Sequence, residues 1–138
     1  MSTSTTATAR PRFKAAMPQF SVSDLMATAD YYRDTLGFEV RGFFGEPPVF
    51  AMVGRDNVEI FFNQLPPGHS TARVRAPVAY DAYLHVTNVD ALAAELRAHG
   101  AAIREGPVDR SYQMREVIVS DLNGLVLAFG EDMGGRAT

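Results

Sequence analysis

The chain of 138 residues contains no cysteine. It therefore has no disulfide framework, no thiol nucleophile and no thiolate metal site. Such a chain suits a reducing cytosol, and we expect a cytoplasmic protein.

Long apolar runs and basic clusters are lacking as well. No apolar run approaches the roughly 20 residues that a bilayer requires, which excludes a membrane-spanning helix. The formal net charge of −3 comes without a basic stripe, so the electrostatic footprint of a nucleic-acid binder is missing. We therefore expect neither a membrane nor a nucleic acid as a partner.

Length and composition indicate one globular domain. Apolar residues make up 46% and charged residues 21% of the chain, which is ordinary for a soluble fold. We assign the domain to residues 14–131 and expect a disordered tail at 1–13 and a flexible tail at 132–138. The first twelve residues are rich in Ser, Thr and Ala with two Arg; a transit peptide is the alternative to a disordered tail.

A duplicated segment is the most informative feature that is present. The motif at 22–25, Val-Ser-Asp-Leu, returns 64 positions later at 86–89 as Val-Thr-Asn-Val. In both copies a valine ends a strand and Asp24 or Asn88 is placed to cap a helix. Gly37 and Gly100 then stand where a helix would end. The pattern predicts one supersecondary unit present twice.

The elements between these signals follow the same order in each half. We predict strands at 15–22, 38–44, 49–53 and 58–63 with a helix from Asp24 to about Leu36, and strands at 78–87, 102–103, 115–120 and 125–129 with a helix at 89–98. Residues 65–77 contain three prolines and read as a surface connection. The chain is thus predicted to be α+β, with two β-α-β-β-β modules at about 14–64 and 78–131 forming a cupped mixed sheet whose outer face carries the helices.

Alternation along the strands separates two faces. One face is wholly apolar and should carry the helices: Pro18, Phe20, Val22, Val58, Ile60, Phe62, Ala82, Leu84, Val86, Leu125, Leu127 and Phe129. The other mixes polar, acidic and aromatic groups: Met17, Gln19, Ser21, Glu59, Phe61, Asn63, Asp81, Tyr83, His85, Val126 and Ala128. Such a face is either exposed to solvent or lines a ligand cavity. Phe61 and Tyr83 would leave a large apolar patch in water, which favours the cavity.

The chain resembles the vicinal oxygen chelate superfamily, which includes glyoxalase I, extradiol dioxygenases and bleomycin-resistance proteins. The resemblance covers about residues 15–131. Its carriers are Asp24-Leu25, Tyr31-Tyr32-Arg33-Asp34-Thr35-Leu36-Gly37-Phe38, Val89-Asp90-Ala91-Leu92, Met114-Arg115-Glu116 and Asp121-Leu122-Asn123-Gly124. It implies a site inside the cup, often at a homodimer interface. The bleomycin-resistance-like branch is the most similar, because Met-Arg-Glu stands near its Gly-Arg-Glu-Phe.

Metal-dependent members of that superfamily place His, Gln or Glu at four positions facing the cup. By the resemblance, these positions fall on Met17, Glu59, Asp81 and Ala128. Only two of them carry oxygen donors, and a thioether and a methyl group do not hold a hard or borderline divalent ion. We therefore expect no metal cofactor. A shifted register with Gln19, Glu59 and His85 is the alternative.

Glu59 is the single candidate for chemistry, because a carboxylate in an apolar cup can act as a base. The competing interpretation is that it pairs with Arg41 or Arg115 or faces water. Of the three histidines, His69 and His99 read as solvated or structural, and only His85 points to the proposed cavity.

The leading hypothesis is a homodimeric, metal-independent protein that binds an aromatic or amphipathic metabolite or antibiotic and sequesters or carries it. The expected ligand-binding residues are Gln19, Phe43, Met52, Glu59, Phe61, Tyr83, His85 and Tyr112, and Glu59 with Asp81 would favour a cationic ligand. The alternatives are a divalent-metal-dependent lyase, isomerase or dioxygenase of the glyoxalase type, and a metal-free enzyme that uses Glu59 as proton acceptor.

Overall fold

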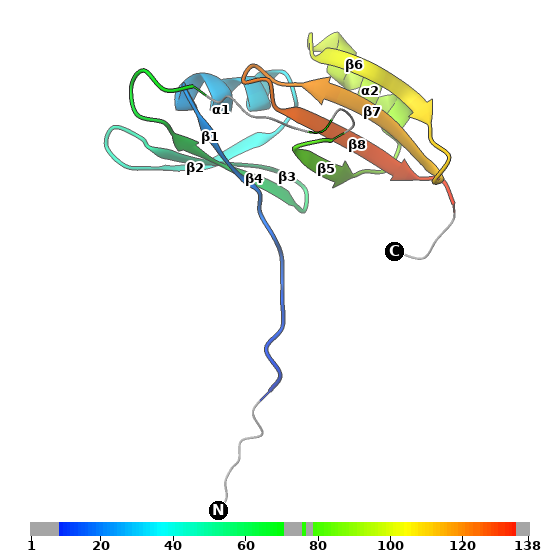
Figure 1. Ribbon diagram of the computed structural model, residues 1–138, viewed down its shortest axis with the longest axis horizontal. Coiled ribbons are helices and arrows are strands. Elements are labelled where there is room, and N and C mark those ends of the chain that lie inside the picture. The colour runs from blue at the N-terminus through cyan, green and yellow to red at the C-terminus, as the bar shows by residue number, and fades with distance from the viewer. Residues whose placement is uncertain (1–8, 71–75, 77–78, 135–138) are drawn as a thin grey trace, which may run out of the picture.

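The computed structural model describes residues 9–70, 76 and 79–134 (Figure 1). The first module contains β1 (Gln19–Val22), α1 (Leu25–Asp34), β2 (Glu39–Phe44), β3 (Phe50–Arg55) and β4 (Val58–Gln64). The second contains β5 (Ala82–His85), α2 (Val89–Ala98), β6 (Ala102–Asp109), β7 (Met114–Ser120) and β8 (Val126–Asp132). The predicted α+β fold with two β-α-β-β-β modules is confirmed.

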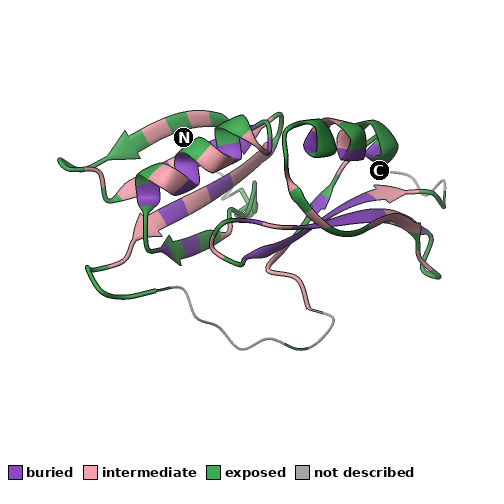
Figure 2. Ribbon diagram, turned by 90° about the horizontal axis from the view of Figure 1, so that it is seen from above, coloured by how far each residue is buried: buried purple, intermediate pink, exposed green. Residues whose placement is uncertain are grey.

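Each module forms its own four-stranded sheet. The strand orders are β1-β4-β3-β2 and β5-β8-β7-β6, which are the same order in the two copies. The first strand of each module pairs in parallel with the last, and the other pairs are antiparallel. Over the described residues the two sheets stay separate and lie side by side, with the helices on one side of the molecule (Figures 1 and 2). They do not close into one cup.

The helix boundaries follow the capping residues that the repeat predicted. The Asp24 carboxylate accepts the Ala27 N–H at 3.0 Å, and the Asn88 amide oxygen accepts the Ala91 N–H at 3.4 Å. Gly37 and Gly100, just after the two helices, have φ of 78° and 80°, a conformation that glycine adopts without steric cost. Neither helix is long and apolar enough to cross a bilayer within the described part of the chain.

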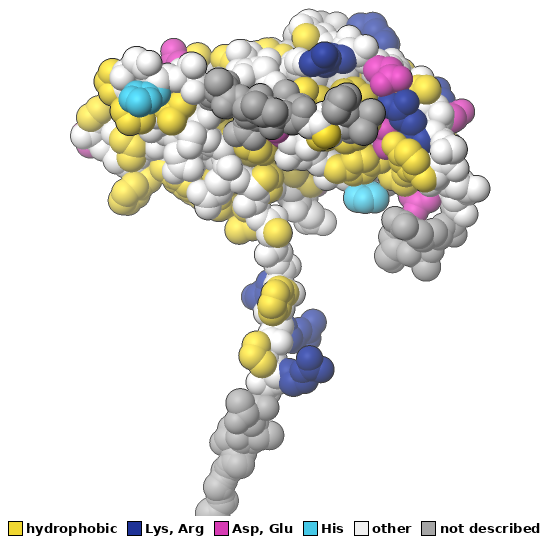
Figure 3. Space-filling model, in the orientation of Figure 1, with side chains coloured by type: hydrophobic (Ala, Val, Ile, Leu, Met, Phe, Trp, Pro, Cys, Tyr) yellow, Lys and Arg dark blue, Asp and Glu magenta, His cyan; other side chains and the backbone are white. Residues whose placement is uncertain are grey.

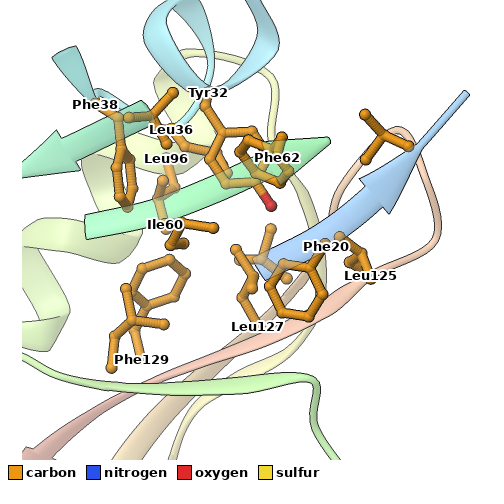
Figure 4. Close-up of a cluster of buried hydrophobic side chains, with 14 of the residues drawn as sticks. Phe20, Tyr32, Leu36, Phe38, Ile60, Phe62, Leu96, Leu125, Leu127 and Phe129 are labelled. Carbon is orange, nitrogen blue, oxygen red and sulfur yellow. The ribbon is translucent and has the colours of Figure 1, made fainter. Parts of the chain in front are cut away.

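One hydrophobic core runs through both modules. The buried sides of both helices face the sheets (Figure 2), and the cluster in Figure 4 joins side chains from both halves. Of the apolar residues predicted to face the helices, those that are buried are Phe20, Val22, Ile60, Phe62, Leu84, Leu125, Leu127 and Phe129. Burial of this face, with its favourable transfer of apolar area from water, holds the two modules in one body.

Several strand lengths differ from the sequence prediction. β1 and β5 are shorter than predicted, because only residues paired with β4 and β8 form a ladder. β6 is longer and irregular, with register shifts between Ile103 and Val108 that hide its alternation. β8 reaches Asp132, so the expected C-terminal tail begins later. Residues 9–13 are exposed, and the rest of the predicted N-terminal tail, like part of the 65–77 connection, lies outside the described residues.

A bulge in β2 reverses the predicted direction of one aromatic side chain. Val40 pairs with Val53 but Gly42 pairs with Met52, so Arg41 is an extra residue in the ladder. The extra residue shifts the alternation by one. Phe43 therefore stands opposite Ala51 on the helix-carrying face, and the prediction that it lies on the same face as Phe61 is wrong.

Candidate functional site

The helix-free face of the first sheet is an open surface rich in aromatic side chains. Residues that the strand pairing places on this face are Gln19, Ser21, Phe44, Phe50, Met52, Glu59, Phe61 and Asn63. Phe50 and Phe61 meet edge to face with ring centroids 5.3 Å apart, and Phe44 is 72% exposed. Hydrophobic side chains gather along this lower side of the molecule in Figure 3. Exposed aromatic side chains among polar ones make this face a candidate binding or association surface.

Glu59 is engaged by a neighbour on this face. Its carboxylate accepts a hydrogen bond from the Arg41 guanidinium at 3.3 Å, and both side chains are about one-third exposed. The guanidinium of Arg115 binds Asp90 and Asp109 instead. The interpretation that Glu59 pairs with Arg41 is thus confirmed, and the paired carboxylate is not set up as a free base.

The helix-free face of the second sheet is built around a buried carboxylate. Glu116 in β7 is 0% exposed. Its oxygens accept hydrogen bonds from the Arg110 guanidinium at 2.8 Å, the Tyr83 hydroxyl at 2.7 Å and the Tyr112 hydroxyl at 2.8 Å. Arg110 also forms a salt bridge with the exposed Glu105. These four residues, Tyr83, Arg110, Tyr112 and Glu116, are called the Glu116 cluster below.

The protonation states within the Glu116 cluster follow from these contacts. Burial opposes ionisation of Glu116, but the hydrogen bonds from Arg110 and the two tyrosines outweigh it and lower its pKa. Burial and the neighbouring carboxylate raise the pKa of Tyr112 to about 12 and raise that of Tyr83 further. At neutral pH the cluster therefore holds a carboxylate, a guanidinium and two neutral phenols, with no net charge.

A cavity of about 480 Å³ opens beside the Glu116 cluster. The residues lining it are Tyr83, His85, Tyr112, Gln113, Met114, Asp132 and Gly134. Tyr83 lies against the backbone of Gly130, where a side chain would clash with its phenol. The rings of Tyr83 and His85 are 5.4 Å apart. The volume lies in the range of small-molecule sites.

The donor set on the helix-free faces does not fit a divalent metal. Two of the four positions expected for metal ligands carry no suitable donor. Met17 lies before β1, and Ala128, whose side chain is a methyl group, pairs with Tyr83 of β5. Asp81 is used in the fold, because its carboxylate accepts the Val126 N–H at 2.8 Å. In the alternative register, Gln19 accepts from the Asn63 amide at 3.3 Å. Within the described ranges there is no group of three His, Asp or Glu residues that could hold a metal ion.

The structure divides the predicted ligand-binding residues between two places. Gln19, Met52, Glu59 and Phe61 share the helix-free face of the first sheet, and Tyr83, His85 and Tyr112 line the cavity of the second. Arg110 and Glu116 were not predicted as site residues, and Phe44 was not among the expected ligand-binding residues. A signal for Glu116 exists: it is an acid two residues before Ile118 in the predicted strand 115–120, and so lies on the same face as Ile118.

Comparisons with known proteins agree with this architecture. The profile of the Glyoxalase/Bleomycin resistance protein/Dioxygenase superfamily matches residues 14–129. No curated protein matches the chain in sequence.

Solved structures are similar in fold at low sequence identity. TioX from Micromonospora sp. ML1 has a TM-score of 0.68 at 16% identity, covering 86% of this chain and 99% of its own. TnmS3, an antibiotic binding protein from Streptomyces sp. CB03234, has a TM-score of 0.66 at 22% identity, covering 88% and 99%. A glyoxylase/bleomycin resistance protein/dioxygenase domain from Frankia sp. EAN1pec has a TM-score of 0.70 at 17% identity, covering 91% and 96%.

Proposed function

Since the chain belongs to the Glyoxalase/Bleomycin resistance protein/Dioxygenase superfamily, we propose that it is a metal-independent small-molecule-binding protein. It sequesters or carries an aromatic or amphipathic metabolite or antibiotic in the cytoplasm. Binding alone performs this role, and no residue on the helix-free faces is required to change its protonation state.

The observation that carries the proposal is the cavity beside the Glu116 cluster. Its walls offer the flat rings of Tyr83 and Tyr112 for stacking and the adaptable thioether of Met114. The hydroxyl groups of both tyrosines are tied to Glu116, so the rings are fixed before a ligand arrives. Preorganised aromatic walls reduce the entropy lost on binding. TnmS3, described as an antibiotic binding protein, shares the fold.

The charges on the helix-free faces favour an uncharged aromatic body over the cationic ligand that the sequence suggested. Glu59 is paired with Arg41, Glu116 with Arg110, and Asp81 accepts a backbone N–H. The charges of the two glutamates are thus compensated within the chain, and the cavity residue Asp132 accepts the Gly134 N–H at 2.9 Å. We infer that ligand recognition rests mainly on stacking and apolar contact.

We further propose that two chains complete the site. In one chain the sheets do not close, and the first sheet carries an exposed Phe44 and a half-buried Phe61 beside the cavity-bearing second sheet. Facing the first module of one chain with the second module of another covers both apolar surfaces and encloses a ligand between them. Such an arrangement is isologous, with the same two patches used on both chains.

The test is a titration of the protein with Nile red, an uncharged planar dye whose emission rises in apolar surroundings. Wild type should bind the dye saturably at one site per chain. Tyr112→Ala removes a ring wall and should weaken binding about tenfold. Tyr112→Phe keeps the ring and should stay within about threefold. Non-saturating binding, or equal affinities for wild type and Tyr112→Ala, would contradict the proposal.

A further inference from the structure

The two modules meet at two junctions that the internal repeat makes equivalent. Each junction joins the helix of one module to the tight turn before the last strand of the other. The modules themselves are equivalent, as matching hydrogen bonds within each show: the Leu25 N–H donates to Gln64 at 2.9 Å, and the Val89 N–H donates to Glu131 at 3.0 Å. Asp121 and Arg55 occupy the same place in the two turns, since each closes its hairpin.

The first junction, between α1 and the β7–β8 turn, is filled by tyrosine. The Tyr32 hydroxyl donates to the Asp121 carboxylate at 2.7 Å in a fully buried contact. The Tyr31 hydroxyl donates to the Ser120 carbonyl at 3.3 Å. The Asn123 side-chain amide donates a hydrogen bond to the Thr28 hydroxyl at 3.1 Å. Two aromatic rings thus occupy the space between the modules.

The second junction, between α2 and the β3–β4 turn, has no aromatic residue at the equivalent helix positions. Glu95 and Leu96 stand 64 residues after Tyr31 and Tyr32. Arg55 in the turn donates two hydrogen bonds to the Glu95 carboxylate, at 2.6 and 2.9 Å. Both members of this ion pair are more than one-third exposed by side chain.

The packing of the two junctions differs accordingly. Val22, Thr28 and Leu125 at the first junction are each 0% exposed. Their counterparts at the second, Val86, Leu92 and Val58, are only partly buried. A cavity of about 470 Å³ lies there, with these three side chains and Leu36, Phe38, Leu84 and Phe129 in its walls. Its rim carries Arg55, Asp56, Asn57, Thr87, Asn88 and Glu95.

We propose that this second junction is a binding site for a small arylalkylamine, distinct from the cavity beside the Glu116 cluster, with which it shares His85 as a lining residue. The ring of such a molecule takes the space that a tyrosine ring fills at the first junction. Glu95 pairs with Arg55, so the carboxylate of Asp56 leaves the rim with one net negative charge, which attracts the protonated amine. The bidentate hydrogen bonds from Arg55 lower the pKa of Glu95, which keeps this carboxylate charged. The proposal does not depend on the function proposed above.

The test uses tyramine as the probe on the ¹⁵N-labelled full chain, followed by two-dimensional NMR. A ligand of this size should bind with a Kd of about 1 mM. The backbone amides of Asn57, Thr87 and Asn88 should shift saturably, whereas those of Tyr112 and Gln113 should not. Shifts centred on Tyr112 and Gln113, or no saturation, would overturn the proposal without any variant being needed.

Two variants and a neutral analogue sharpen the test. Ala91→Trp places an indole at the cavity wall and should weaken tyramine binding at least tenfold. Ala94→Trp, on the same helix but outside the lining residues, should leave it within twofold. The neutral analogue 2-phenylethanol should bind at least threefold more weakly than tyramine. Equal tyramine affinity for the two variants, or equal affinity for the two probes, would contradict the proposed class of ligand.

Discussion

Glu116 organises the helix-free face of the second sheet, because a fully buried carboxylate must have its lone pairs satisfied. Its carboxylate accepts hydrogen bonds from one guanidinium and two phenol hydroxyls. These bonds fix the side chains of Tyr83 in β5 and of Arg110 and Tyr112 in the β6–β7 connection. The aromatic walls of the cavity thus depend on one acid.

Replacing Glu116 by Leu should lower the free energy of unfolding by about 3 kcal/mol, because a buried ion pair loses one partner and two hydroxyls lose their acceptor. The matched control is Glu105→Gln, which removes the exposed partner of the same Arg110 and should cost at most about 0.5 kcal/mol. Urea unfolding of the three proteins measures both. A loss for Glu116→Leu no larger than that of the control would show that the cluster is not structural.

The same carboxylate should make stability depend on acid pH. The pKa of Glu116 is lower in the folded chain than its usual value of 4.5, so its stabilising effect is complete above the unfolded pKa and is lost as the pH falls through the folded pKa. Wild type should therefore lose more stability than Glu116→Gln between about pH 5 and pH 3. Parallel pH profiles of the unfolding free energy would refute this assignment. Burial raises the pKa of Asp121, so protonation of this residue at acid pH favours the folded chain. Because Asp121 is present in both proteins, its effect cancels in the comparison.

At the scale of the elements, the bulge in β2 decides which aromatic residue faces a ligand. Phe43 and Phe44 are adjacent in sequence, and Arg41 as the extra residue turns Phe44 rather than Phe43 toward the helix-free face. The edge strand thereby adds a ring to the surface formed by Phe50 and Phe61.

This pair of neighbours gives a matched test of the first sheet. Phe44→Ala should weaken Nile red binding about fivefold, because it removes apolar area from the proposed binding face. Phe43→Ala removes the same atoms from the opposite face and should leave the affinity within twofold. Fluorescence titrations of both variants measure the difference. The reverse order of effects would place the site on the helix-carrying face.

The bulge also shows where prediction from the sequence ends. Capping residues such as Asp24 and Asn88, the glycines after the helices and strict alternation in β4 and β8 are local signals, and the elements they predict are confirmed. The local signal of the bulge is Gly42, an isolated glycine inside the predicted strand 38–44. Without the bulge taken into account, Phe43 was expected among the ligand-binding residues. The Glu116 cluster was missed for a related reason: Arg110 and Tyr112 lie in an irregular connection, and only the folded turn brings them to β7.

At the scale of the whole molecule, the separation of the two sheets is the main feature. One core joins the modules through their helix-carrying sides. The helix-free face of the first sheet carries the exposed Phe44, whereas on that of the second sheet Ile118, Val126 and Ala128 are buried with Tyr80 packed against them, beside the open cavity. In the proposed arrangement, a second chain supplies the surface that encloses the ligand.

The proposed dimer is directly measurable. Multi-angle light scattering at about 10 µM should give twice the chain mass of 15.1 kDa. Phe44→Asp places a charge in the apolar face and should shift the protein to the monomer, since an unpaired charge is costly to bury. Phe43→Asp, on the other face of the same strand, should remain dimeric. A monomeric wild type would leave each cavity open to solvent and contradict the two-chain site.

The central claim is that the helix-free faces bind an aromatic molecule without a metal ion. Its most direct test is the Nile red titration of protein dialysed against EDTA, with elemental analysis of the same sample and a parallel titration after adding Zn²⁺, Ni²⁺, Mn²⁺ or Fe²⁺. We expect the same saturable affinity, within about twofold, in the metal-free sample and after each addition, since the described residues of the two helix-free faces supply no donor set for such an ion. Binding that is lost with the metal and restored by one of these ions would contradict it.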